Sequence, residues 1–280
     1  MSVNKVANLR AFFADPKNTV TRERIFFNRL SFDLKLAAAR AGYHLHLYEP
    51  DVDRDGFDFV AEDDEDAIGW FQNKAVLASA GTASWDISID FLRPALNAVE
   101  RYGWELVEAG RGGGVILVEI ADKDTSGSVT YRYTDFDILA AIEHEMLRER
   151  PWTGRGKPAA PAKDNASAIL KSLRTDRTKT VSLPKNVFIT IDKPDDLLGV
   201  MGMRSELGYG MFAIRDAYGF IQIDAAGALV PQNHSIDSAA AAHYHLELLC
   251  GVQPSSTAKK VALFDPFDWE RLPIAGPSVT

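Results

Sequence analysis

Apolar residues recur at steps of three and four from Thr19 to Ala41, which predicts an amphipathic helix that ends at Gly42. Three later segments alternate apolar and polar residues, as strands with one buried face do. They are YHLHLY (43–48), GFDFVA (56–61) and AIGWFQNKAVL (67–77). The acidic sequence EDDED joins the second segment to the third, so these two strands are expected to pair as a hairpin.

The next segments alternate between helix and strand. A helix is predicted to begin near Pro94 and to end at Gly103, and a second helix is expected from Asp135 to Arg150. Between them lie two strands that are expected to form a hairpin, VILVEI (115–120) and VTYRYT (129–134). The pattern of helices and strands over residues 1–150 therefore predicts one α/β domain.

Residues 151–166 read PWTGRGKPAAPAKDNA, and this content of proline, glycine and alanine is typical of an interdomain linker. The remaining residues, 167–280, contain a basic segment, a strand, a short helix, a hairpin pattern and an alanine-rich helix pattern. We therefore expect a small α+β domain after the linker, which would supply substrate recognition, oligomer contacts or regulation.

The composition, 46% hydrophobic and 25% charged over 280 residues, is ordinary for a soluble globular protein. No apolar run approaches the roughly 18 residues of a membrane-spanning helix, and the N-terminus lacks the apolar segment of a signal peptide. We expect a cytoplasmic protein with no membrane partner. The net charge of −8 argues against a surface built wholly for polyanions, but it leaves room for a local basic groove.

Polar residues of different chemistry lie on the second and third predicted strands. Strand alternation places Asp58 on the face opposite Phe57 and Phe59, and it places Gln72 and Lys74 on one face together. If the two strands pair across the acidic turn, a carboxylate, an amide and an amine converge on one surface of the sheet.

This combination suits metal-assisted cleavage of phosphodiester bonds. Magnesium prefers oxygen ligands and keeps several waters, so the predicted ligands are the Asp58 carboxylate, the Gln72 amide oxygen and the Asn73 backbone carbonyl. Lys74 would orient the attacking water, stabilise the developing charge or accept a proton. Glu23 lies on the stripe of the first helix that is expected to face the sheet, where it would contact a metal-bound water or Lys74.

These residues resemble the PD-(D/E)XK, or restriction-endonuclease-like, nuclease superfamily, whose pattern is an acid on the first helix, GxD on one strand and (E/Q)xK on the next. Here the pattern reads Glu23, Gly56-Phe57-Asp58 and Gln72-Asn73-Lys74. The resemblance covers residues 19–145 and implies a central mixed sheet flanked by helices. It also implies cleavage of nucleic acid, DNA before RNA, with Mg²⁺ or Mn²⁺. Most members carry an acid where Gln72 stands, so weaker metal binding is expected.

Four residues after the third strand are candidates for binding phosphate, base or sugar: Ser79, Thr82, Ser84 and Trp85. The alternative is a polar loop with Trp85 anchored in the core. In GRGGG (110–114), Arg111 is a candidate contact to the nucleic-acid backbone, and the segment itself is expected to be a flexible turn in preference to a phosphate cradle.

The sequence thus predicts a metal-dependent nuclease. A second hypothesis is a catalytically weak or inactive nuclease-fold module for nucleic-acid binding or protein assembly, and a third is an acidic protein that binds a basic partner. Structural alternatives also stay open for the site residues: a cross-strand ion pair between Asp58 and Lys74, and a helix-dipole role for Glu23.

Overall fold

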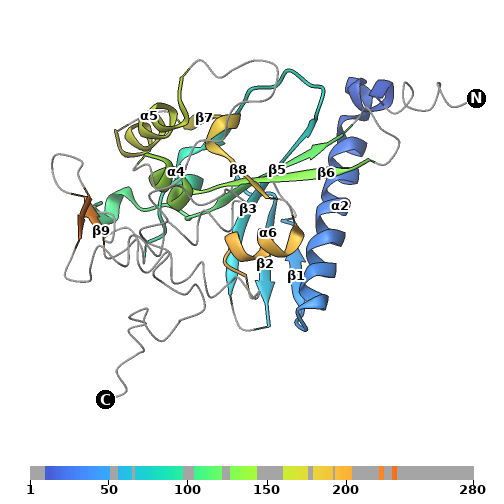
Figure 1. Ribbon diagram of the computed structural model, residues 1–280, viewed down its shortest axis with the longest axis horizontal. Helices are drawn as coiled ribbons and strands as arrows, with labels where there is room; N and C mark the ends of the chain where they lie inside the picture. Colours follow the sequence, from blue (N-terminus) through green and yellow to red (C-terminus); the bar gives the residue numbers. More distant parts are fainter. Residues whose placement is uncertain are drawn as a thin grey trace, which may run out of the picture.

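The computed structural model describes residues 10–50, 56–64, 67–96, 104–121, 127–143, 160–175, 179–191, 193–203, 221–223 and 229–231. A six-stranded sheet in the order β1-β2-β3-β5-β6-β8 lies at the centre, with helices around it (Figure 1). The strands are β1 Leu45–Tyr48, β2 Phe59–Asp63, β3 Ile68–Leu77, β5 Gly114–Ile120, β6 Val129–Thr134 and β8 Ile189–Ile191. The predicted α/β class is confirmed.

The sheet is mixed. β1, β2 and β3 form an antiparallel meander, β5 runs parallel to β3, and β6 and β8 continue antiparallel. A parallel neighbour needs a crossover connection, and here the chain passes from β3 to β5 through β4 (Ser84–Ser88) and the short helix α3 (Ile89–Leu92). The first helix, the three strands after it and the later strands β5 and β6 follow one another as predicted, whereas β4 was not predicted.

Helices α2 (Thr19–Arg40) and α6 (Pro194–Val200) pack against each other on one face of the sheet. The hydroxyl of Tyr131 on β6 donates to the carboxylate of Asp33 on α2 at 2.6 Å, which joins this helix to the sheet. The buried side of α2 carries Phe26, Leu30, Leu34, Ala37 and Ala38, at the spacing that predicted the helix. We call this the helix face of the sheet.

The opposite face is covered in part by α4 (Phe136–Glu143) and α5 (Ala162–Thr175), which pack against each other and against the 3₁₀ helix η4 (Lys185–Val187). Lys185 of η4 reaches Glu119 of β5 at 2.6 Å, and Glu119 lies in register with residues of the face opposite α2. A two-stranded sheet of β4 and β7 (Thr180–Pro184) lies beside these helices. The remaining short elements are η1 Pro16–Asn18, η3 Leu106–Glu108, β9 Ile221–Ile223 and β10 Leu229–Pro231.

The predicted domain boundary is wrong for residues 160–203. Helix α5 begins inside the expected linker, β7 pairs with β4, β8 is the sixth strand of the central sheet, and α6 packs on α2. These elements complete the first domain, because they cover or extend its sheet. Beyond residue 203 the structure describes only β9 and β10, which pair antiparallel. A separate C-terminal domain stays a prediction, and the predicted helix near Ser238 lies outside the described residues.

The structure describes only part of two other segments that were predicted to be helical. The helix near Pro94 is instead α3, which ends at Leu92, since Arg93 is extended (φ −56, ψ 146), as the residue before a proline prefers to be. Residues 97–103, where that helix was expected to continue, lie outside the described part. The helix expected from Asp135 is described as α4, and residues 144–150 are not described.

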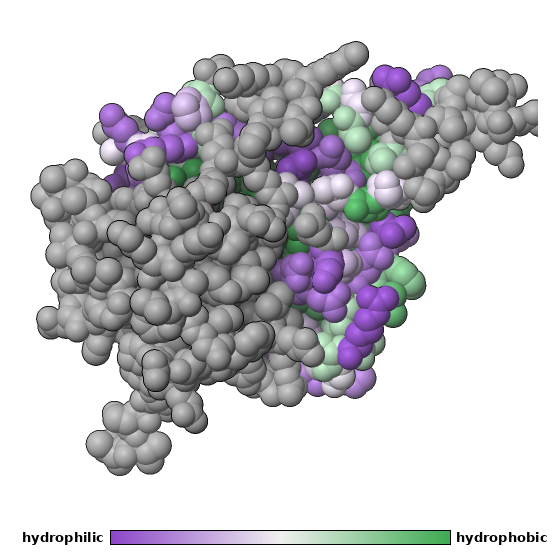
Figure 2. Space-filling model, viewed as in Figure 1, coloured by the Kyte–Doolittle hydropathy of each residue, from purple (hydrophilic) through white to green (hydrophobic). Residues whose placement is uncertain are grey.

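The outer side of α2 exposes apolar side chains. Figure 2 shows hydrophobic patches among hydrophilic ones on the described surface around this helix. Ile25, Phe32 and Leu36 are 40%, 62% and 38% exposed, and their spacing places them on one stripe. Within the described residues, no helix combines the length and the apolar character that a membrane span requires.

Candidate functional site

Asp58 immediately precedes β2, and two hydrogen bonds hold it against β3. Its backbone N–H donates to the carbonyl of Phe71 at 2.9 Å, and its Oδ2 accepts from the backbone N–H of Asn73 at 2.6 Å. The carboxylate therefore replaces a backbone carbonyl that a continuing strand would have offered to Asn73. The structure thus places the carboxylate beside the segment Gln72-Asn73-Lys74, as the sequence predicted.

The prediction that Phe57 and Phe59 share one face is wrong. Phe57 packs edge-on against Trp70 with ring centroids 4.9 Å apart, whereas Phe59 stacks on Phe71 at 5.4 Å. Trp70 and Phe71 are consecutive in a strand and point to opposite faces, so Phe57 and Phe59 do so as well. Strand alternation does not extend to Phe57, because β2 begins only at Phe59 and the N–H of Asp58 donates to Phe71, which is the register partner of Phe59. The hydrogen bond to Asn73, and not alternation, directs the Asp58 carboxylate.

Gln72 is half-buried, and its Oε1 is a buried acceptor for which the structure shows no hydrogen-bond donor in the described part of the chain. A buried acceptor without a partner costs about 1–3 kcal/mol, and such groups in folded proteins call for an explanation. Gln72 follows Trp70 at a two-residue step and shares its face, which is the face opposite α2. A cation at this position would supply the missing partner, so the predicted magnesium ligand fits its surroundings.

The Asn73 side chain lies on the opposite face of β3 from Gln72 and Lys74. Its side-chain Oδ1 is also buried without a described donor, and its N–H is used by Asp58. The backbone carbonyl of Asn73 stays a predicted ligand.

Lys74 is half-buried on the same face as Gln72. Among the ion pairs of the described residues, none involves Lys74. The structural alternative of a cross-strand ion pair with Asp58 is therefore not observed. A cation beside an oxygen-rich site, with no described carboxylate to neutralise it, is suited to contact an anionic substrate.

Glu23 is exposed, so its predicted orientation toward the sheet is wrong. Its angular position on α2 agrees with the buried stripe, but the buried positions of this helix begin only at Phe26. Glu23 thus lies nearly one helical turn before the first buried position. Glu23 therefore does not join Asp58 and Lys74 in the described site.

Arg111 is brought beside the site by ring contacts. Its guanidinium lies 5.5 Å from the ring centroid of Phe57 and 5.5 Å from that of Trp70. Cation–π contacts of this kind fix the side chain next to the residue that precedes Asp58. The structure supports the position predicted for Arg111 at the site, and its role in substrate binding stays a prediction.

The segment GRGGG is tightly packed, and the expectation of a flexible turn is wrong. Four successive backbone N–H groups donate to carbonyls of residues 90–94 at 2.8–2.9 Å, so they cannot cradle a phosphate. A methyl group on Gly113 would lie 2.3 Å from the Phe91 ring, and one on Gly114 would lie 2.3 Å from the Tyr133 hydroxyl. Glycine is needed here for close approach between the crossover and β5.

The predicted substrate-binding segment after β3 is only partly a loop. Ser84 and Trp85 belong to β4, which pairs with β7, and the Trp85 ring packs edge-on against Phe188 with centroids 5.7 Å apart. Trp85 is thus anchored in the core, as the alternative held. Thr82 and Ser84 are exposed and Ser79 is half-buried. The structure brings none of these four residues to Asp58 by any described contact.

Sequence reasoning missed one neighbour of the site. A methyl group on Gly56 would lie 3.5 Å from the Cβ of Ser88, so Ser88, the last residue of β4, borders the turn that leads to Asp58. Nothing local in the sequence indicates this proximity, because it depends on how the crossover folds back.

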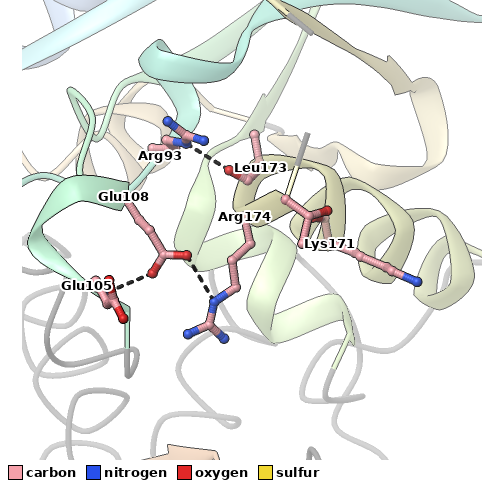
Figure 3. A network of polar contacts seen from close by, with 7 residues as sticks. Arg93, Glu105, Glu108, Lys171, Leu173 and Arg174 are labelled. Atoms are coloured by element: carbon pink, nitrogen blue, oxygen red, sulfur yellow. Dashed lines mark hydrogen bonds and ion pairs between the residues drawn. The ribbon is translucent and has the colours of Figure 1, made fainter. Parts of the chain in front are cut away.

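The basic run after the predicted linker has structural partners. Arg174 lies 3.3 Å from Glu108 and 5.4 Å from the Trp104 ring, and Arg93 donates to the carbonyl of Leu173 at 2.7 Å. Figure 3 shows this network between α5 and the segment before β5, with the Lys171 side chain directed away from it. Arg174 therefore fastens α5 to the segment before β5.

In the described ranges, no group of three or more histidine, cysteine, aspartate or glutamate side chains is arranged to hold a metal ion. The candidate site consists of one carboxylate, one amide oxygen and one amine. No family model matches this chain, and neither a curated protein nor a solved structure matches it. The interpretation of the site depends on its own geometry.

Proposed function

We propose that this chain hydrolyses phosphodiester bonds of nucleic acid, DNA in the first instance, with Mg²⁺ as the cofactor and Mn²⁺ as a substitute. One observation carries the proposal: the Asp58 carboxylate is fixed at 2.6 Å from the Asn73 N–H, beside a buried Gln72 oxygen that has no described donor. A carboxylate and an amide oxygen are ligands of the kind that magnesium prefers.

Asp58 and Gln72 would hold the metal, and water molecules would complete its coordination. The bound metal would lower the pKa of a water ligand and offset negative charge on the phosphate. The backbone hydrogen bond from Asn73 holds the Asp58 carboxylate in one orientation, so little reorganisation is needed when the cation binds.

Lys74 is assigned a role toward the substrate. Its ammonium would bind a non-bridging oxygen of the scissile phosphate and orient the attacking water. Water forms the new P–O bond and gives up a proton to solvent, while the bond to the leaving sugar oxygen breaks and that oxygen takes up a proton from solvent. The absence of a described ion pair at Lys74 supports this role, since a neutralised lysine would stabilise the phosphate charge less well.

A second candidate function is a nuclease-fold module that binds nucleic acid or assembles with protein without cutting. The observation that favours it is the small number of acidic side chains in the site, because Gln72 stands in place of an acid and Glu23 is exposed away from it. Fewer negative charges mean weaker metal binding, and a site that stays empty cannot hydrolyse its substrate.

The test is a cleavage assay with supercoiled plasmid, linear duplex, single-stranded DNA and RNA, each with Mg²⁺, Mn²⁺ or EDTA. The proposal predicts metal-dependent cleavage of at least one substrate, and loss of that cleavage in Asp58→Asn. Binding to nucleic acid without turnover in any metal would favour the second candidate. Cleavage that persists in EDTA would contradict the metal-dependent mechanism.

A further inference from the structure

Beside the candidate site, the face of β1, β2 and β3 that is opposite α2 carries aromatic side chains. Tyr48 of β1 lies in register with Val60 of β2, and Val60 lies in register with Trp70 of β3. Residues directly opposite each other in a sheet share a face, so Tyr48, Val60 and Trp70 form one row across three strands. We call these three residues the aromatic row.

The aromatic row is exposed at Tyr48, whereas Val60 and Trp70 are half-buried and pack against the core. Tyr48 is 51% exposed, and its ring lies nearly parallel to that of His46, with centroids 6.2 Å apart and an angle of 22°. The Glu62 carboxylate beside the Tyr48 hydroxyl raises the pKa of this phenol, which stays neutral at physiological pH. At the other end of the row, Arg111 and Phe57 pack against Trp70 and limit its motion.

The row is continuous with the proposed catalytic residues. Gln72 follows Trp70 by two residues on the same face, and Lys74 follows Gln72 by two more. Two residues along a strand span about 7 Å, so the row lies about one nucleotide of an extended strand away from the site. A scissile phosphate at Asp58 and Gln72 would place a neighbouring base over the aromatic row.

We propose that the aromatic row of Tyr48, Val60 and Trp70, with Arg111 at its end, is a stacking platform for unpaired bases, so that the substrate is single-stranded or locally opened nucleic acid. This inference rests on the proposed nuclease function. Aromatic rings bind every base through its π-face, whereas the bases inside a duplex are already stacked on each other. Arginine at the end of the row adds a planar cation that stacks on a base or pairs with a phosphate.

The charges nearby favour this occupant over a protein partner with a basic surface. Arg111 and Lys74 lie on the side of the row toward the site, whereas Glu62 lies beside the Tyr48 hydroxyl and the exposed Asp64 follows β2 on the far side. A strand of nucleic acid would therefore approach from the site and end near Tyr48. Single-stranded DNA and single-stranded RNA both present unpaired bases of this kind, so both are candidate ligands.

The experiment measures binding of fluorescein-labelled single-stranded DNA, single-stranded RNA and duplex DNA of equal length, in EDTA and in an Asp58→Asn background. Tyr48→Leu is the test variant. Phe32→Leu is the matched control, since Phe32 is 62% exposed on α2 at the other face. We expect a single strand to bind more tightly than duplex, and Tyr48→Leu to weaken single-strand binding roughly tenfold, with Phe32→Leu unchanged. The preferred single strand, DNA or RNA, identifies the source.

The result that would overturn the platform is duplex binding at least as tight as single-strand binding, or equal affinities for Tyr48→Leu and Phe32→Leu. Trp70→Phe tests the same idea at the other end of the row, and it should retain most of the affinity because a ring remains. Tyr48-dependent binding with no cleavage in any metal would support the platform and refute the proposed hydrolysis. Cleavage that depends on Asp58 but is indifferent to Tyr48 would support the hydrolysis and refute the platform.

Discussion

Replacing Asp58 by asparagine or by alanine separates the structural contribution of its carboxylate from its proposed chemical role. The Oδ2 of Asp58 accepts one backbone hydrogen bond, from Asn73 at 2.6 Å. Asparagine retains an oxygen that accepts this bond and loses only the charge. Alanine removes the acceptor and leaves the Asn73 N–H without it.

The two variants should therefore differ in stability. A hydrogen bond to a charged group contributes about 1.5–3 kcal/mol and a neutral one about 0.5–1.5 kcal/mol, so Asp58→Asn should lose about 1 kcal/mol. Asp58→Ala should lose about 1–3 kcal/mol, because a partly buried donor is left unpaired. Cleavage should fall at least about 100-fold in both, since neither side chain supplies a carboxylate to the metal.

Urea unfolding in EDTA gives the stabilities, and a cleavage assay in Mg²⁺ gives the activities. Asp86→Asn is the control, because Asp86 is exposed on β4 and the same charge is removed there. The control should match the wild type in both assays. Wild-type cleavage by Asp58→Asn would refute the reasoning, and so would equal stabilities of the asparagine and alanine variants.

Three further predictions concern the metal ligand, the core and the response to acid. Gln72→Glu should lose about 1–3 kcal/mol of stability in EDTA, because it buries a second carboxylate near Asp58, and Mg²⁺ should restore that stability. An equal loss of stability with and without Mg²⁺ in thermal unfolding would contradict the assignment of Gln72 as a metal ligand. Phe59→Ala should cost about 3–5 kcal/mol in urea unfolding, because this fully buried ring packs between Phe27 and Phe71, whereas Phe32→Ala on the surface should change stability by under about 0.5 kcal/mol. Burial alone would raise the pKa of Glu119, but the nearby Lys185 and Arg132 outweigh burial and lower this pKa. The contribution of Glu119 to stability is therefore complete above its unfolded pKa of about 4.3, and it is lost as the pH falls through the lower folded pKa. Glu119→Gln should flatten the acid side of a plot of unfolding free energy against pH, and an unchanged slope would refute the assignment.

Much of the sheet could be predicted from local pattern. The helix from Thr19 and the strands β1, β2, β3, β5 and β6 follow from periodicity, because each buries one face against a neighbour close in sequence. The nearness of Asp58 to the segment 72–74 also follows, since both belong to one hairpin. The orientation of the carboxylate could not be predicted, because it depends on the hydrogen bonds that Asp58 makes to Phe71 and Asn73.

What sequence reasoning missed depends on distant pairings. β4 lies in a segment interpreted as a loop, and its partner β7 is about a hundred residues away, so no local periodicity links the two. β8 likewise joins the sheet from beyond a segment whose composition is typical of a linker. Glu23 shows a different limit: helical periodicity gives the direction of its side chain but not the position along the helix at which burial begins.

The most direct test of the central claim compares Lys74→Gln with Lys35→Gln in one assay. Both replacements remove one positive charge, but Lys74 lies beside Gln72 on the face of β3 opposite α2, whereas Lys35 is exposed on α2. The measurement is the initial rate of Mg²⁺-dependent cleavage of the preferred nucleic acid. We predict a rate near the wild type for Lys35→Gln and a loss of at least about 100-fold for Lys74→Gln. Equal rates for the two variants would contradict the proposed nuclease site.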